Sequence, residues 1–222
     1  MTGSFETKIG YDQTIKFGMN GIFSTPVYGS ANIKKITKAE LDFVEEQKSR
    51  VTTNKSNFTT VQSINTHVLE DSAFKDLKNV IDQHLNTYLK QVVCPVEEDI
   101  KIYITQSWLN YTSIDQFHHE HNHPNSFLSG VFYLKADKEI DGIHFTKPAV
   151  PGILNIPPKK INIYNSTDWG FKIDEGALII FPSWLHHYVE SKKDNKERIS
   201  LSFNTFVKGS IGSAGKKTQL KL

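Results

Sequence analysis

Residues 198–206 read Arg198-Ile-Ser-Leu-Ser-Phe-Asn-Thr-Phe206, with polar and apolar side chains in alternation. A period of two is typical of a β-strand whose two faces have different surroundings. The face of Ile199, Leu201 and Phe203 is expected in the core. The opposite face would be an ordinary polar surface if solvated. If this opposite face lines a pocket, its guanidinium and hydroxyl groups suit a carboxylate ligand. The residues of this polar face are Arg198, Ser200, Ser202 and Asn204.

This strand closes a series of short segments of similar character that begins after Pro95. Many are rich in β-branched or aromatic residues, and turn signals such as Asp141-Gly142 separate them. About eight short strands with no helices between them indicate a β-sandwich or jelly roll. The predicted strands are 100–111, 127–136, 143–147, 152–156, 160–165, 169–174, 177–182 and 197–207.

Two helices are predicted before the strands. Thr37 and Glu40 have the spacing of a capping box at the start of the first. Apolar residues recur at steps of three and four over 71–93, which predicts a second, longer helix that Pro95 ends. His84 lies beside its apolar stripe and is expected to pack there rather than bind a metal. The order predicts an N-terminal helical buttress on one sheet of a mainly β (α+β) fold.

The length of 222 residues suits a single domain. We expect one domain over 1–222, with strands and buttressing helices in 1–95, a jelly-roll core in 96–208 and a tail in 209–222. Apolar residues make up 38% of the chain, which is enough for one core. Cys94 is the only cysteine, so no intramolecular disulfide can form.

Several function classes are disfavoured. The N-terminus lacks the basic and apolar regions of a signal peptide, and no apolar run approaches the roughly 20 residues that span a bilayer. We therefore expect a cytoplasmic protein without a membrane partner. The net charge of +2 argues against a nucleic-acid partner. Residues 23–28, interrupted by Pro26, read as an edge strand, and the exposed edge near 20–30 would allow a homodimer.

Four histidines fall within the six residues 118–123. Neutral imidazole is a common ligand of iron, zinc and copper. In an extended segment alternate side chains share a face, which places His118 and Glu120 on one face. The other face would carry His119, His121 and His123. Two neighbouring histidines on this face could chelate one ion, and His121 belongs to both possible pairs.

A second histidine pair follows about sixty residues later. It ends the apolar segment Ala177-Leu-Ile-Ile-Phe-Pro-Ser-Trp-Leu-His-His187. His186 and His187 should point in different directions, so one of them is expected to join the first cluster at a metal. Two close ligands and one distant ligand are typical of a mononuclear site on a β-scaffold.

The order of these motifs resembles the 2-oxoglutarate- and Fe(II)-dependent oxygenases, which share a double-stranded β-helix (jelly-roll) core. The motifs of this chain are similar to those of a subgroup common in marine bacteria and their phages, and its core resembles that of prolyl-hydroxylase-like members. A phage gene would place the protein in the host cytoplasm. The resemblance spans most of the chain. It rests on Ile-Phe-Ser-Thr-Pro-Val-Tyr28, His121-Asn-His-Pro-Asn-Ser-Phe-Leu-Ser-Gly-Val-Phe-Tyr-Leu134, Phe181-Pro-Ser-Trp-Leu-His-His-Tyr-Val-Glu190 and Glu197-Arg-Ile-Ser-Leu-Ser-Phe-Asn204.

The resemblance implies a role for individual residues. The metal ligands would be His121, His123 and His187, the last preferred to His186 by the family pattern His-x-Val. The cofactors would be Fe(II), the small-molecule cosubstrate 2-oxoglutarate, and O2. Trp108 and Asn110 would line the pocket. The distal carboxylate of 2-oxoglutarate would be held by Arg198, Ser200 and Tyr133.

One position departs from the family. Most members have a carboxylate where this chain has His123, which gives two histidines and one carboxylate around iron. Three neutral histidines would leave a higher net charge and would also suit zinc, nickel or copper. An alternative triad of His118, Glu120 and a distal histidine would restore a carboxylate, but it needs the other face of the strand.

By resemblance, the reaction would couple oxidative decarboxylation of 2-oxoglutarate to hydroxylation of a substrate that the sequence does not identify. Two alternatives remain open at this stage. A cupin-like enzyme with three histidines would not use 2-oxoglutarate and would not need Arg198 as a carboxylate anchor. A non-catalytic jelly-roll binding or structural module would hold its metal in a closed, four-coordinate site.

Overall fold

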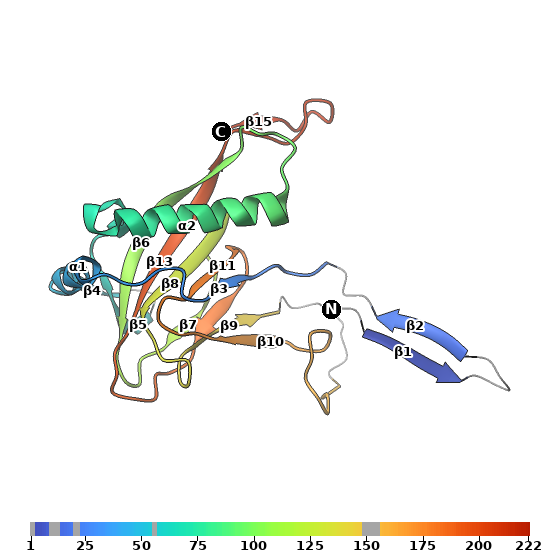
Figure 1. Cartoon of the computed structure of the whole chain (residues 1–222), viewed down its shortest axis with the longest axis horizontal. Coiled ribbons are helices and arrows are strands. Elements are labelled where there is room, and N and C mark those ends of the chain that lie inside the picture. The colour runs from blue at the N-terminus through green and yellow to red at the C-terminus, as the bar shows by residue number, and fades with distance from the viewer. Residues whose placement is uncertain (1–2, 9–13, 20–22, 55–56, 148–155) are drawn as a thin grey trace.

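The computed structural model describes residues 3–8, 14–19, 23–54, 57–147 and 156–222. Two antiparallel sheets face each other, and helices cover the outer face of the larger one (Figure 1). This is the predicted mainly β jelly roll with an N-terminal helical buttress.

The larger sheet has seven strands in the order β3-β11-β8-β13-β6-β5-β4. Its central strands carry the long alternating patterns of the sequence. The strand bounds are β3 Tyr28–Ser30, β4 Val51–Asn54, β5 Asn57–Ser63, β6 Lys101–Thr112, β8 Leu128–Lys135, β11 Leu178–Pro182 and β13 Arg198–Lys208.

The smaller sheet has the order β10-β9-β12-β7. Its bounds are β7 His118–His121, β9 Gly142–Thr146, β10 Asp168–Lys172 and β12 His187–Val189. Two hairpins form sheets of their own: β1 Gly3–Lys8 with β2 Thr14–Met19, and β14 Ser210–Ile211 with β15 Leu220–Lys221.

Helix α1 spans Lys38–Lys48 and has the predicted capping box: the Glu40 amide donates to the Thr37 hydroxyl, and the Thr37 amide donates to the Glu40 carboxylate. The predicted helix 71–93 is a 3-10 turn, η2 Ser72–Phe74, followed by α2 Lys75–Tyr88 and a π-helical turn, η3 Leu89–Val93. A further 3-10 turn, η1, spans Val68–Glu70.

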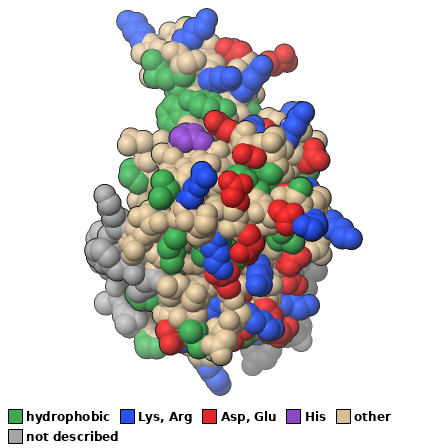
Figure 2. Space-filling view, turned by 90° about the vertical axis from the view of Figure 1, so that its left-hand side faces the viewer, with side chains coloured by type: hydrophobic (Ala, Val, Ile, Leu, Met, Phe, Trp, Pro, Cys, Tyr) green, Lys and Arg blue, Asp and Glu red, His purple; other side chains and the backbone are tan. Residues whose placement is uncertain are grey.

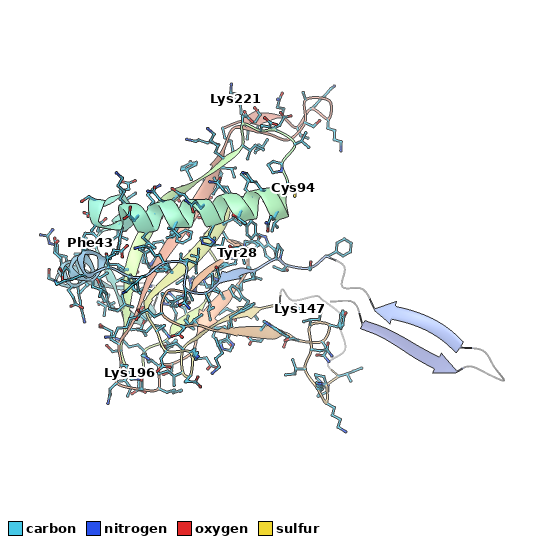
Figure 3. The ribbon with its side chains drawn as sticks, in the orientation of Figure 1. Tyr28, Phe43, Cys94, Lys147, Lys196 and Lys221 are labelled. Atoms are coloured by element: carbon cyan, nitrogen blue, oxygen red, sulfur yellow. The ribbon has the colours of Figure 1, made fainter. Side chains whose placement is uncertain are left out.

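Helix α2 runs across β6, β13 and β8 (Figure 1). Its apolar stripe, which includes Leu77, Ile81 and Leu85, packs with Leu109 and Leu201 of the sheet in one buried cluster. His84 packs as predicted: its Nδ1 lies 2.6 Å from the Tyr28 hydroxyl, on the edge strand β3 below α2 (Figure 3). The helices therefore seal one face of the larger sheet and leave the other for the smaller sheet.

Two of the predicted strands need correction. Residues 160–165 form a turn, because the Asn162 side chain accepts a hydrogen bond from the Tyr164 amide at 2.8 Å and competes with strand pairing. The edge strand predicted at 23–28 is instead Tyr28–Ser30. The strand predicted at 152–156 lies, except for Ile156, outside the described residues.

Candidate metal and cosubstrate site

A cavity lies between the two sheets, and every predicted site residue lines it. The larger sheet supplies its floor from the polar face of β13 and the neighbouring strands. The smaller sheet and the turn that follows β7 supply its histidines. Trp108 and Asn110 also line it, as the sequence predicts. The six predicted site residues in its wall are His121, His123, Tyr133, His187, Arg198 and Ser200.

Three histidines converge on one point of this cavity. One ring nitrogen of each of His121, His123 and His187 lies within 4.8 Å of the other two. His121 and His187 face each other across the paired strands β7 and β12, with ring centroids 4.3 Å apart. His123 follows β7, and its amide donates to the Ser183 carbonyl at 2.9 Å, which ties this turn to the β11–β12 loop. Backbone hydrogen bonds thus hold β7, its following turn and the β11–β12 loop next to one another around the three histidines.

Backbone carbonyls fix the tautomers of two of these rings. His121 Nδ1 lies 2.8 Å from the His119 carbonyl oxygen, and His187 Nδ1 lies 3.1 Å from the Leu185 carbonyl oxygen. A carbonyl only accepts, so each Nδ1 carries the proton and donates. Each Nε2 then keeps a free lone pair, which is the arrangement that orients metal-binding histidines in proteins.

The surroundings also keep the histidines neutral. Burial, reinforced by the neighbouring histidines, lowers the pKa of His187 to about 2 and that of His123 to about 4. Burial also lowers the pKa of His121. The neutral form is the one that binds metal, so at pH 7 protons compete weakly for these nitrogens.

His118 also lines the cavity, which corrects the prediction that it points away from His121. The register of β7 against β12 changes within this short pair: His121 opposes His187, but His118 opposes Val189. Three steps on β7 therefore match two on β12, as in a β-bulge. The bulge breaks strict alternation, so the rings of His118 and His121 come within 4.9 Å of each other, centroid to centroid.

Glu120 and His186 lie outside the cavity. The Glu120 carboxylate accepts a hydrogen bond from His186 Nδ1 at 3.2 Å, and about half of each side chain is exposed. His187, by contrast, is 4% exposed. This geometry argues against the alternative triad containing Glu120, and it favours His187 over His186.

The floor of the cavity is a ladder of cross-strand neighbours. On β13, Ser200 lies between Asn110 of β6 and Tyr133 of β8. Arg198 lies one step along the same face, opposite Thr112, and is only 5% exposed. The polar face of β13 is therefore inside the protein, and its guanidinium is a buried cation at the wall of the cavity.

The Arg198 side chain has a buried partner that the sequence reading missed. Its Nη1 donates to Asp141 Oδ1 at 3.1 Å, and the Asp141 side chain is 2% exposed. In the sequence, Asp141 marks only a turn before Gly142. An acidic residue directly before a strand, as Asp141 is before β9, is too common in sequences to identify it as the partner of Arg198.

The fold and the cavity together define a metal-binding jelly-roll protein. Residues 106–204 match the family model described as "Putative 2OG-Fe(II) oxygenase". This segment holds all six predicted site residues and is similar to the 2-oxoglutarate- and Fe(II)-dependent oxygenases. No curated protein matches the sequence.

Solved structures of this fold resemble the chain at low identity. HygX from Streptomyces hygroscopicus, with nickel, 2-oxoglutarate and hygromycin B bound, is 12% identical over 82% of each chain, with a TM-score of 0.56. A Pseudomonas putida prolyl-4-hydroxylase is 14% identical over 82% of this chain and 92% of its own, with a TM-score of 0.52. The epimerase SnoN, in complex with Fe3+, alpha ketoglutarate and nogalamycin RO, is 7% identical over 82% of this chain and 79% of its own, with a TM-score of 0.57. At such identities the likeness establishes the fold.

Proposed function

We propose that this protein is a 2-oxoglutarate- and Fe(II)-dependent dioxygenase that couples oxidative decarboxylation to hydroxylation of its substrate. The observation that carries the proposal is the meeting, in one cavity, of a three-histidine cluster and a buried arginine. The histidine cluster suits a metal ion and the buried arginine suits a carboxylate, so one cavity offers both to a metal-bound dicarboxylate.

The donor set fits a divalent transition metal. His121, His123 and His187 would hold Fe(II) through three neutral nitrogens, and two of them have the tautomer this requires. When bound, Fe(II) supplies the reaction with O2 that links loss of CO2 from 2-oxoglutarate to oxidation of a substrate C–H bond. Because His123 replaces the usual carboxylate, the protein leaves the metal's charge unreduced, which favours an anionic cosubstrate.

The floor residues would bind the far end of the cosubstrate. Arg198 offers a planar pair of donors to a carboxylate, and the Ser200 hydroxyl lies on the same face. Burial raises the pKa of Tyr133, so its phenol stays protonated and able to donate. The apolar wall, which includes Phe181 and Ile143, would exclude water from the reacting groups.

The test is succinate formation from 2-oxoglutarate by the purified protein supplied with Fe(II) and O2. The readout is the product of the cosubstrate itself, so no substrate needs to be identified first. We expect succinate that depends on both Fe(II) and O2 and disappears in the His187→Ala variant. Absence of succinate from iron-loaded protein that also fails to bind 2-oxoglutarate would contradict the proposal.

His118 favours one alternative, a closed structural metal site. It is a fourth histidine in the cavity wall, beside His121. If it completed a four-coordinate site, no position would remain for 2-oxoglutarate, and the protein would be a binding or structural module. The His118→Ala variant separates the two functions: metal affinity should be nearly unchanged if three histidines suffice, and much weaker if the site is closed.

A further inference from the structure

Arg198 belongs to a cluster of buried charged side chains behind the cavity wall. Asp141 accepts a hydrogen bond from Arg198 Nη1 at 3.1 Å and also receives Lys192 Nζ at 3.3 Å. The exposed fractions of the Arg198, Asp141 and Lys192 side chains are 5%, 2% and 1%. A lysine buried to this degree is rare and needs a specific reason.

Lys192 is held in place by the backbone. It lies in the loop between β12 and β13, where its amide donates to the Gln116 carbonyl at 2.9 Å and its carbonyl accepts from the Asp115 amide at 2.9 Å. Asp141 directly precedes β9. Asp141 and Lys192 line an outer hollow next to Lys196 rather than the histidine cavity. They can reach a ligand in the cavity only through Arg198.

The charges of this cluster balance only with Lys192 present. Lys192 also pairs with Asp194, at 2.7 Å, so the set holds two cations and two carboxylates. Removing Lys192 would leave two carboxylates against the single cation of Arg198. The remaining donor to Asp141 is neutral: the Asp137 amide, 3.0 Å from Oδ2. Without Lys192, the buried carboxylate of Asp141 would be offset by Arg198 alone, which would leave Arg198 less able to pair with a ligand carboxylate.

We infer that Asp141 and Lys192 are positioning residues for the cosubstrate: Asp141 orients the Arg198 guanidinium, and Lys192 offsets the charge of Asp141 so that Arg198 stays available to a ligand carboxylate. Without Lys192, Asp141 alone would satisfy Arg198 and would repel the incoming carboxylate. This inference rests on the proposed function and gives a reason for burying a lysine that does not line the histidine cavity.

The test measures the dissociation constant of 2-oxoglutarate from nickel-loaded protein in the absence of O2. In the Lys192→Met variant we expect 2-oxoglutarate to bind ~10-fold or more weakly, because a close like charge now opposes it. The affinity for nickel alone should not change. Lys192→Gln, a second neutral replacement that is more polar, carries the same expectation should the methionine variant fold poorly.

The deciding variant removes both charges. Asp141→Asn combined with Lys192→Met restores the wild-type net charge of the cluster and keeps an amide oxygen to accept from Arg198. We expect its 2-oxoglutarate affinity to return to within about 3-fold of wild type. A purely structural role for the pair would instead make the double variant at least as weak as the single one.

Two controls isolate the charge effect. Lys196 lines the same hollow and pairs with Asp137 at 3.2 Å, but its side chain is 72% exposed, and it lies on the outer surface in Figure 3. Lys196→Met makes the same charge change in water and should leave affinity unchanged. The keto acid 2-oxopentanoate lacks the distal carboxylate and should bind wild type and Lys192→Met equally.

The outcomes separate this inference from the proposed function. Wild-type protein that binds nickel but not 2-oxoglutarate would overturn both. Wild-type protein that binds 2-oxoglutarate, with unchanged affinity in Lys192→Met or no recovery in the double variant, would overturn only the roles of Asp141 and Lys192.

Discussion

His186 and His187 are adjacent in sequence but have opposite surroundings. His187 is 4% exposed and faces His121, whereas His186 is about half exposed and pairs with Glu120. Their side chains point in opposite directions at the start of β12. The same substitution at His186 therefore serves as the control for a substitution at His187.

The first prediction uses this pair. His187→Ala removes one of three proposed ligands and should weaken metal binding by more than the roughly 10–100-fold that loss of an outer hydrogen-bond partner costs. His186→Ala should leave the affinity within about 3-fold of wild type. Competition with a chromophoric chelator measures both. Equal effects of the two substitutions would contradict the assignment of His187.

The second prediction concerns acid sensitivity of the metal-free protein. The pKa of His187 is about 2 and that of His123 about 4 in the fold, against an ordinary value of 6.5, because burial penalises the charged ring. Below about pH 6.5 the unfolded chain therefore binds protons that the folded chain does not. Stability is full above pH 6.5 and falls as the pH drops from there toward 4.

The free energy of unfolding should fall by at least about 1.4 kcal/mol per pH unit between pH 6 and pH 5, the slope for one such histidine. Urea unfolding of metal-free protein at several pH values measures it. His187→Gln should have a shallower slope. A stability that is flat from pH 7 to pH 5 would show that these rings are not held neutral.

At the residue scale, the sequence predicted the cavity lining well where strands alternate regularly. Arg198 and Ser200 share a face of β13, as their spacing requires. His118 was misplaced because a β-bulge in the β7–β12 pair is set by tertiary packing and has no signature in the local pattern. Asp141 and Lys192 were missed because their partnership joins distant loops.

Among the elements, the pairing of β8 with β13 depends on a glycine. Gly130 lies opposite Phe203, and the Phe203 ring occupies the space that a side chain at position 130 would need. Phe203 is fully buried and belongs to the cluster under α2. Close approach at this position thus helps to pack the centre of the larger sheet.

Gly130→Ala should therefore destabilise the protein by about 1–3 kcal/mol, the usual cost of overpacking a core. The matched control is Gly29→Ala on the edge strand β3, where a new Cβ would meet Ile179 Cδ1 at 3.4 Å, an ordinary contact. Chemical denaturation compares the two variants with wild type. If Gly130→Ala were as stable as Gly29→Ala, the proposed packing would be wrong.

Elements with strong periodicity were predictable, and polar ones were not. The α2 stripe and the capping box of α1 were found because each follows from local chemistry. The hairpin of β4 and β5 is rich in threonine, serine and asparagine and was missed, since its pairing with β6 comes from the sheet rather than from an apolar pattern. Residues 160–165 form a turn and not the predicted strand, because the Asn162 side chain binds the backbone there.

For the whole molecule, the decisive fact is that helices cover only one face of the larger sheet. The other face then needs the smaller sheet, and the cavity between them receives polar side chains from β13 and histidines from β7 and β12. Figure 2 shows acidic and basic side chains intermixed over one face of the molecule, in keeping with a net charge of +2.

Within the described part of the chain, no helix is both long and apolar enough to cross a bilayer. The homodimer and the division of the chain into 1–95, 96–208 and 209–222 stay predictions.

The central claim is that the three histidines and Arg198 form one site for a metal and 2-oxoglutarate. Calorimetric titration of 2-oxoglutarate into nickel-loaded protein, without O2, tests it most directly. We predict one 2-oxoglutarate bound per chain in wild type, and an affinity on the order of 100-fold weaker in Arg198→Ala with nickel binding unchanged. Equal 2-oxoglutarate affinity in the two proteins would contradict the account.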